Sequence, residues 1–249
     1  MDGGSSSRLA SLADRLRSAR RITVLTGAGI SAASGVPTFR GEDGLWRNYR
    51  PEDLATARAF DRDPALLWEW YGWRRQTIAG CAPNAAHDVL ARWSRSDDRT
   101  TVVTQNVDDL HLKAGTERLV RLHGSIWELS CSRGCPAGRN AWRDERVPLP
   151  GLPRCAHCQA LARPAVVWFG EMLAEADLRA AVQATVCDVF LTVGTSSVVY
   201  PAAGLVEQAR HNGAFTAEIN AEATPATAVV DLAIHASAET VLPEVDLLL

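Results

Sequence analysis

Four of the six cysteines fall into two close pairs, an arrangement that commonly holds a metal ion. The pairs are Cys131-Ser-Arg-Gly-Cys135 and Cys155-Ala-His-Cys158, with a short stretch between them. Four thiolates complete the tetrahedral shell of one Zn²⁺ and leave no position for water or substrate, so the predicted zinc is structural. The first pair is spaced by three residues where two is more usual, and His157 could replace one thiolate. Cys81 and Cys187 are expected to be small buried residues.

A second motif, Gly27-Ala28-Gly29-Ile30-Ser31-Ala32, has the spacing of a dinucleotide-binding loop. Its small residues would let backbone N–H groups approach a pyrophosphate. In a hydride-transfer enzyme the chain would continue through a helix and a second strand to an acidic residue about 20 positions on. Here residues 34–41 contain Pro37 and two glycines instead, which predicts a loop lying over the nucleotide. The alternative is that the first glycines only make a tight turn.

Polar side chains also follow three other predicted strands, where the ligands of open α/β sheets bind. These polar segments are Thr104–Asp109, Gly194–Ser197 and Asn220–Glu222. They offer hydroxyl, amide and carboxylate groups suited to phosphate and ribose. His123, just before the first cysteine pair, is the best candidate for a general base, because an unperturbed imidazole has a pKa of about 6.5. A single histidine is more often structural, however.

The elements that must position these residues alternate between strand and helix. Short apolar or β-branched runs predict strands at 22–26, 100–104, 186–193 and 215–219, and helical patterns lie at 7–20, 84–95, 173–185 and 202–212. This alternation predicts an α/β fold with a mostly parallel, doubly wound sheet. Two stretches interrupt it: the Trp-rich residues 45–78, helical in their later half, and the cysteine-bearing residues 126–163. We expect these two stretches to form a second, smaller lobe.

The composition limits the location and the partners. With 249 residues, 47% of them hydrophobic, the chain can bury a sizeable core in one or two domains. It has no apolar run of the ~18 residues that a membrane helix needs and no signal-like apolar core at its start, so we expect a cytoplasmic protein without a membrane partner. The net charge of -3, without long runs of one sign, gives no support for nucleic-acid binding.

Taken together, the motifs resemble those of the sirtuins, which are NAD-dependent protein-lysine deacylases. The match runs from about Leu9 to Pro243, with the motifs in the family's order. The resemblance implies a single catalytic unit with a large Rossmann-like domain of residues 7–39, 84–125 and 164–249. A small domain would combine the helical insertion 40–83 with the zinc ribbon 126–163. The matching segments are Gly27–Ser31, Pro37–Gly41, Thr104–Asp108, Leu122–Gly124, the cysteine pairs, Val166–Glu171, Gly194–Ser196 and Asn220–Glu222.

The resemblance also implies a role for each segment. The adenosine and phosphates of NAD would lie at Gly27, Ala28, Gly29, Ser31, Gly194, Thr195, Ser196, Asn220 and Glu222, and Phe39 and Arg40 would lie over the diphosphate and nicotinamide. Gln105, Asn106 and Asp108 would bind the nicotinamide ribose and carboxamide. His123 would act as general base on a ribose hydroxyl, with Asn106 as the second catalytic residue, so that the acyl group passes to that sugar and the products are nicotinamide, free lysine and O-acyl-ADP-ribose. The segment formed by Val167, Trp168, Phe169, Gly170 and Glu171 matches the strand that pairs with the substrate peptide.

A narrower resemblance concerns the acyl group. Tyr71 and Arg74 are three residues apart and share a helix face, so their phenol and guanidinium could together bind a carboxylate. This pair resembles that of the class III sirtuins, which remove succinyl, malonyl or glutaryl groups, and Ala55 matches the small residue that widens their acyl pocket. The alternative is a core Tyr71 and a solvated Arg74. Ala165 departs from the family pattern, in which close relatives carry His.

Three classes of function remain to be compared. A lysine deacylase uses all the motifs, and acetyl groups could be substrates too, which leaves a plain deacetylase as one alternative. A mono-ADP-ribosyltransferase would need the same NAD site but no receptor for an acidic acyl group. A non-catalytic zinc-ribbon adaptor would have no need of His123 and Asn106.

Overall fold

The computed structural model describes residues 3–38, 49–96, 98–138 and 140–249. Its larger sheet has the strand order β3-β2-β1-β7-β8-β9, and every neighbouring pair is parallel. The strand order reverses between β1 and β7, which creates the crevice in which doubly wound sheets bind their ligands. The predicted parallel α/β fold is therefore confirmed. The strands are β1 (Ile22–Thr26), β2 (Thr100–Thr104), β3 (Leu119–Arg121), β7 (Val189–Val193), β8 (Phe215–Asn220) and β9 (Leu232–His235).

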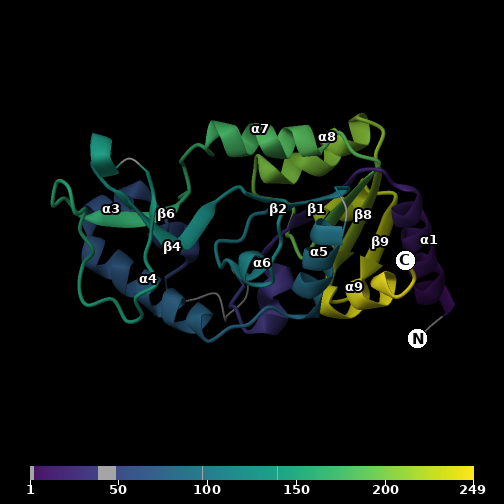
Figure 1. Cartoon of the computed structure of the whole chain (residues 1–249), viewed down its shortest axis with the longest axis horizontal. Helices are drawn as coiled ribbons and strands as arrows, with labels where there is room; N and C mark the ends of the chain where they lie inside the picture. Colours follow the sequence, from purple (N-terminus) through teal and green to yellow (C-terminus); the bar gives the residue numbers. More distant parts are fainter. Residues whose placement is uncertain (1–2, 39–48, 97, 139) are drawn as a thin grey trace.

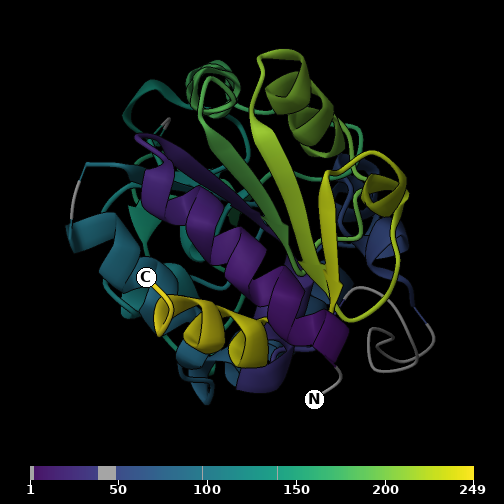
Figure 2. The same cartoon turned by 90° about the vertical axis from the view of Figure 1, so that its right-hand side faces the viewer.

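Helices cover both faces of this sheet (Figures 1 and 2). On one face lie α1 (Gly3–Ser18), α5 (Ala85–Ser96) and α9 (Ala238–Asp246), whose apolar side chains share a core with β1 and its neighbours. On the other face lie α7 (Glu175–Ala184) and α8 (Leu205–His211). Because the strands are buried on both faces, they are continuous runs of apolar and β-branched residues rather than alternating ones. This is the pattern that made the central strands predictable.

A second lobe carries the smaller sheet, which is antiparallel in the order β5-β4-β6. Its strands are β4 (Gly124–Cys131), β5 (Trp142–Arg143) and β6 (Ala162–Val166). The helices α2 (Pro51–Leu54), α3 (Ala57–Arg62) and α4 (Pro64–Ala79) share an apolar core with this sheet. Figure 1 shows α3 and α4 beside β4 and β6, at the end of the molecule remote from α1.

Side chains on one face of α4 form hydrogen bonds that attach the helix to the smaller sheet and its neighbouring residues. Trp68 Nε1 donates to the carbonyl oxygen of Ala162 at 3.0 Å. Arg75, seven residues later, donates to the Asp144 carboxylate at 3.0 Å, and the side chains of this ion pair are 1% and 4% exposed. Residues 68, 71 and 75 share one helix face, because neighbours on a helix are three or four residues apart. The rotation of α4 about its axis is therefore fixed by polar contacts as well as by packing.

Several predicted boundaries are wrong by a few residues. The strand expected from residue 186 begins at Val189, because the Asp188 carboxylate accepts the N–H groups of Arg20 and Arg21 and forms a turn there. The helix expected at 202–212 starts as the 3₁₀ turn η4 (Ala202–Gly204). The short strands β3 and β9 and the helix α9 were not predicted. Among the described helices, none has the length and apolar character needed to cross a bilayer.

Candidate active site

The loops that follow β1 and β7 pack backbone against backbone where the strand order reverses. Gly27 N donates to Val193 O at 3.1 Å, and Gly29 N donates to Gly194 O at 2.7 Å. A Cβ on Gly27 would lie 2.7 Å from Thr195 Cα, and a Cβ on Gly29 would lie 2.8 Å from Gly194 Cα. Any side chain at either position would push the two loops apart. The glycines therefore do more than make a tight turn, since they let two loops meet at one edge.

Ser31, in the 3₁₀ helix η1 (Ala28–Ser34), is the centre of a buried hydrogen-bond network beside these loops. Its Oγ accepts from Asn106 Nδ2 at 3.2 Å and donates to Asp108 Oδ2 at 2.8 Å. Asn106 Nδ2 also donates to Gly27 O at 3.0 Å, which ties the loop after β2 to the loop after β1. Burial raises the pKa of Asp108, against the lowering effect of its hydrogen bonds from Leu110 N and Ser31. Three predicted NAD-site residues are thus in direct contact.

The other predicted NAD residues line the same edge of the sheet. Gln105 Nε2 donates to Thr195 Oγ1 at 2.9 Å, which joins the loops after β2 and β7. Asn220, at the end of β8, donates to Thr195 O at 3.4 Å and to Glu222 O at 3.1 Å. Ser196 is half-buried and the Glu222 side chain is exposed. The loops after β2, β7 and β8 therefore present hydroxyl, amide and carboxylate groups at the same edge of the larger sheet.

His123 lies in the turn that joins β3 to β4. Its Nδ1 is 2.8 Å from the carbonyl oxygen of Gln105. Because a carbonyl oxygen can only accept, Nδ1 carries the proton and Nε2 carries the lone pair. Burial lowers the pKa of His123 below its ordinary value, although the bond to Gln105 opposes this effect. The imidazole is therefore held neutral at pH 7, in the protonation state that a general base requires.

Two other histidines, His87 and His111, lie buried beneath the Ser31 network, and neither was among the predicted site residues. His111 Nε2 is 2.9 Å from Thr26 Oγ1, and His87 Nε2 is 3.4 Å from Ser31 Oγ. Their rings lie 4.9 Å apart. Burial lowers the pKa of His87 to about 4 and that of His111 to about 3, so both are neutral at pH 7. The sequence feature that could have indicated His87 is its position on the apolar face of the predicted helix 84–95, three residues after Asn84.

The two residues of the predicted acyl receptor, Tyr71 and Arg74, lie about one turn apart on α4. Tyr71 is 1% exposed, and its hydroxyl oxygen accepts a hydrogen bond from Trp168 Nε1 at 2.9 Å. Arg74 is half-buried, with its guanidinium carbon 5.1 Å from the centre of the Trp70 ring. Burial lowers the pKa of Arg74, and the charges of Tyr71 and Asp108 oppose this effect. Arg74 is therefore not a solvated surface arginine, because it is half-buried and its guanidinium lies against the Trp70 ring.

The segment Val167–Glu171 is not a strand, so this part of the prediction was wrong. Strand β6 ends at Val166, and a turn follows in which Gly170 has a φ of 86°. Trp168 N donates to Glu171 Oε2 at 2.8 Å. This bond occupies an N–H group that a strand would offer to its neighbour, and it closes the turn.

The same turn is attached to three parts of the site. Val167 N donates to His123 O at 3.0 Å, next to the candidate base. Phe169 N donates to Ala55 O at 2.9 Å, which joins the turn to the segment between α2 and α3. Ala55 is 7% exposed, and it lies in the apolar core that contains Tyr71. The predicted acyl-pocket residue, the acyl receptor and the candidate base therefore surround one turn.

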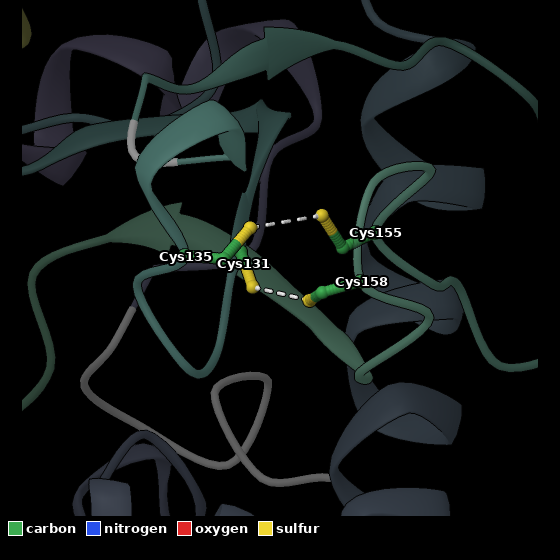
Figure 3. Close-up of side chains that lie close together, drawn as sticks. All are labelled: Cys131, Cys135, Cys155 and Cys158. Carbon is green, nitrogen blue, oxygen red and sulfur yellow. Dashed lines mark hydrogen bonds between the residues drawn. The ribbon is translucent and has the colours of Figure 1, made fainter.

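The four paired cysteines form a cluster at the far end of β4 (Figure 3). Cys131 Sγ is 3.4 Å from Cys158 Sγ, and Cys135 Sγ is 3.7 Å from Cys155 Sγ. All four sulfurs lie within 4.8 Å of one another. A tetrahedral Zn²⁺ with Zn–S bonds of about 2.3 Å separates its sulfurs by about 3.8 Å, so the cluster fits one zinc.

The backbone near the cysteines leaves space for the four sulfurs. A Cβ on Gly138, which lies in the 3₁₀ turn η3 (Pro136–Gly138), would be 2.8 Å from Cys155 Sγ and 3.0 Å from Cys135 Sγ. Glycine therefore leaves the room that the sulfurs occupy. His157 is exposed, and the cluster found among the described residues consists of the four cysteines without it.

Comparison with known proteins decides the family. The Sir2 family model matches residues 27–201, which span the loop after β1, the cysteine cluster and the loop after β7. The chain belongs to the Sir2 family. It is similar to an Aquifex aeolicus protein named NAD-dependent protein deacylase, with 47% identity over 226 residues that cover 90% of this chain and 93% of that protein. The resemblance noted from the motifs is thus confirmed.

Two further proteins that are similar to this chain extend the comparison. The mitochondrial NAD-dependent protein deacylase sirtuin-5 of Canis lupus familiaris is 43% identical over 263 residues, which cover 96% of this chain and 85% of that protein. A solved structure described as a Sir2 homolog–NAD complex has a TM-score of 0.89 at 42% identity, covering 95% of this chain and 91% of that chain. The agreement in fold therefore extends beyond the matched motifs to almost the whole length of this Sir2 protein.

The predicted site residues of this Sir2 protein separate into three groups. The polar residues of the NAD site and His123 lie around the carboxyl ends of the larger sheet, and the acyl-receptor residues lie on α4 and beside it. The four cysteines form the cluster described above. Phe39 and Arg40 lie outside the described residues.

Proposed function

We propose that this Sir2 protein is an NAD-dependent protein-lysine deacylase that favours acyl groups ending in a carboxylate. These are the succinyl, malonyl and glutaryl groups, and acetyl groups are accepted as well. The observation that carries the proposal is the position of Arg74, which lies half-buried on α4 three residues after the buried Tyr71, with a charge that acts on the Asp108 carboxyl. The receptor for the acyl group and the residues for nicotinamide ribose are therefore neighbours. The names of the Aquifex aeolicus and dog relatives support the deacylase activity.

NAD is the co-substrate, and its ribose accepts the acyl group. Gln105, Asn106 and Asp108 hold the nicotinamide ribose and the carboxamide, a role supported by their direct contacts with the neighbouring loops. Phe39 and Arg40 cover the diphosphate and nicotinamide. The residues that hold the adenosine and phosphates are Gly27, Ala28, Gly29, Ser31, Gly194, Thr195, Ser196, Asn220 and Glu222. Their alignment along the edge where β1, β7 and β8 end supports this assignment.

His123 is the general base. The Gln105 carbonyl keeps the proton on Nδ1, so Nε2 can remove a proton from a ribose hydroxyl. Because burial lowers the pKa of this histidine, the neutral form persists at a lower pH than for an exposed imidazole. Asn106 positions the sugar for this proton transfer. The acyl oxygen of the substrate displaces nicotinamide from the ribose, and one water is consumed as the acyl group passes to the sugar, so the products are nicotinamide, free lysine and O-acyl-ADP-ribose.

Arg74 and Tyr71 bind the terminal carboxylate of the acyl chain. The pKa of Tyr71 is raised to about 12, mainly by burial, so the phenol stays protonated and can donate to the carboxylate. Arg74 supplies the opposite charge in a partly dry environment, where charge-assisted hydrogen bonds are strong. Ala55 leaves room for the acyl chain. An acetyl group fits the same pocket but cannot use either donor.

The substrate is an acyl-lysine protein or peptide that lies along Val167, Trp168, Phe169, Gly170 and Glu171. The N–H groups of Val167, Trp168 and Phe169 are used within the protein, so the backbone carbonyl oxygens of this segment would accept hydrogen bonds from the peptide, in a manner that tolerates many sequences. The chain acts as one catalytic unit with a large domain of residues 7–39, 84–125 and 164–249 and a small domain of residues 40–83 and 126–163. The two separate sheets and their separate cores support this division. We also infer a cytoplasmic location, where thiols stay reduced for metal binding.

Zinc has a structural role in this proposal. Cys131, Cys135, Cys155 and Cys158 would hold one Zn²⁺ with no open coordination position. The metal would connect the end of β4 to the loop at 155–158, and it supplies folding energy rather than chemistry.

A panel of matched peptides tests the function directly. Purified protein would be incubated with NAD and the same peptide carrying acetyl-, malonyl-, succinyl- or glutaryl-lysine, with nicotinamide and acyl-ADP-ribose measured. The proposal predicts that the three acidic groups are removed with a higher kcat/KM than acetyl. Equal or better removal of acetyl would identify a plain deacetylase. Transfer of ADP-ribose to protein without deacylation would identify a mono-ADP-ribosyltransferase.

A further inference from the structure

The indole N–H of Trp168 has a contact that substrate binding through the backbone does not explain. Nε1 donates to the hydroxyl oxygen of Tyr71 at 2.9 Å, and the two residues are 2% and 1% exposed. Since the Tyr71 oxygen accepts this bond, its own O–H must donate in another direction. Bulk water has little access to either side chain, so the direction of the O–H depends on the protein and on the ligand.

The indole ring is itself held tightly. The guanidinium carbon of Arg163 lies 3.5 Å from the centre of the ring, which is a close cation–π contact. Arg163 in turn makes two bonds to the Glu171 carboxylate, of 2.5 and 2.8 Å. That carboxylate also accepts from Trp168 N at 2.8 Å, and the Phe60 ring lies 5.5 Å from the Trp168 ring. The indole N–H therefore points at Tyr71 from a fixed position.

We propose that Trp168 is a positioning residue for acyl specificity, because its indole N–H occupies the Tyr71 oxygen and directs the phenol O–H towards the carboxylate of an acidic acyl chain. This inference rests on the proposed function, since it adds a residue to the same receptor. A hydrogen bond accepted by a phenol oxygen also polarises its O–H and strengthens it as a donor. An acetyl group has no carboxylate, so its removal does not depend on this orientation.

The assignment also gives a role to the turn at 167–171. The Glu171 side chain, predicted to contact substrate, makes its contacts with Arg163 and with Trp168 N. These contacts hold the Trp168 indole against Tyr71. The turn therefore connects the segment proposed for peptide binding with the receptor for the end of the acyl chain.

The test compares Trp168→Phe with the parent on matched succinyl- and acetyl-lysine peptides. We expect kcat/KM for the succinyl peptide to fall about five- to tenfold, the effect of one ordinary hydrogen bond, mainly through KM. Both peptides meet the same backbone segment, so any loss on the acetyl peptide should be smaller than the loss on the succinyl peptide, and the succinyl-to-acetyl ratio should fall. The matched control is Trp93→Phe, which removes an indole N–H bond to Asp246 Oδ1 in the core of the larger sheet, away from α4. The control should lower thermal stability but keep the succinyl-to-acetyl ratio.

A double-mutant cycle separates positioning from packing. If Trp168 acts through the Tyr71 hydroxyl, Trp168→Phe should not change the ratio further when it is made in Tyr71→Phe. An unchanged ratio in Trp168→Phe, or additive losses in the double variant, would overturn the inference while leaving the proposed function intact. A parent enzyme without succinyl preference would overturn both. Should Trp168→Phe fail to fold, Arg163→Gln removes the cation over the indole, and the same drop in the ratio is expected.

Discussion

Replacing Arg74 with Met tests the acyl receptor with little disturbance of the fold. Met has a similar length and a flexible apolar side chain, so it can keep the packing against the Trp70 ring, 5.1 Å from the present guanidinium. The charge next to Tyr71 and Asp108 disappears. Because Arg74 is half-buried, a carboxylate bound there in the variant would lose its counter-charge in a partly dry site.

The expected loss in kcat/KM for Arg74→Met follows from the kind of hydrogen bond that Arg74 would make with the acyl carboxylate. A hydrogen bond to a charged group contributes roughly 1.5–3 kcal/mol, and a factor of ten corresponds to about 1.4 kcal/mol. Loss of one such bond should therefore lower kcat/KM for a succinyl peptide by about one to two decades. The loss should appear mainly in KM, because the carboxylate lies far from the reacting carbonyl. Removal of acetyl should stay unchanged or improve.

The assay measures kcat/KM for matched succinyl- and acetyl-lysine peptides on the parent, Arg74→Met and Tyr71→Phe. The Tyr71 variant should also lose about 1–3 kcal/mol of stability, because it leaves the buried Trp168 N–H without its acceptor. Arg74→Met removes no such acceptor and serves as the cleaner variant. An unchanged succinyl-to-acetyl ratio in Arg74→Met would refute the receptor. Equal losses on both peptides would instead point to a packing role.

Three further results are expected. His123→Ala should keep NAD affinity by calorimetry but lose about 10²–10⁴-fold in turnover, and turnover within a few-fold of the parent would remove His123 from its role. Elemental analysis should find about one zinc per chain, and Cys155→Ser should lower the melting temperature. His157→Ala should have almost no effect on either measurement, and a parent-like Cys155→Ser would show that the ligand set is wrong. Stability should fall on acidification below pH ~6.5, because the unfolded state binds protons that the buried His87 and His111 do not, with pKa values of about 4 and about 3. At pH 5 each imidazole should cost about 2 kcal/mol, measured by urea unfolding at pH 7 and 5, and a flat profile would contradict their burial as neutral groups.

The features predicted well from the sequence are those with a local cause. Strands β1 and β2 were predicted to the residue, because a strand buried on both faces is a short apolar and β-branched run with polar ends. The four cysteines were predicted as metal ligands from their spacing alone, since two close cysteine pairs are typical of a zinc site. Their sulfurs meet in the fold as expected.

The features missed depend on contacts between distant segments. Val167–Glu171 has the β-branched and aromatic residues of a strand, but the Glu171 carboxylate takes the Trp168 N–H and closes a turn. His87 and His111 are far apart in the sequence, and only the folded sheet brings their rings within 4.9 Å. Sequence spacing could not reveal these pairings, because each depends on the positions of other elements.

The surroundings of Arg74 depend both on the local spacing along α4 and on contacts of α4 with distant segments. Spacing alone placed Tyr71 and Arg74 near each other on a helix, but it did not distinguish a receptor from a core residue beside a surface residue. The outcome depends on the rotation of α4, which is determined by the contacts of Trp68 with β6, of Tyr71 with the turn after β6, and of Arg75 with Asp144 just after β5. Position 74 precedes Arg75 by about 100° around the helix, so these contacts leave Arg74 half-buried at the edge of the attached face, against the Trp70 ring. The acyl specificity that we propose is thus a consequence of how α4 is attached to the smaller sheet, whose strand β4 ends at Cys131.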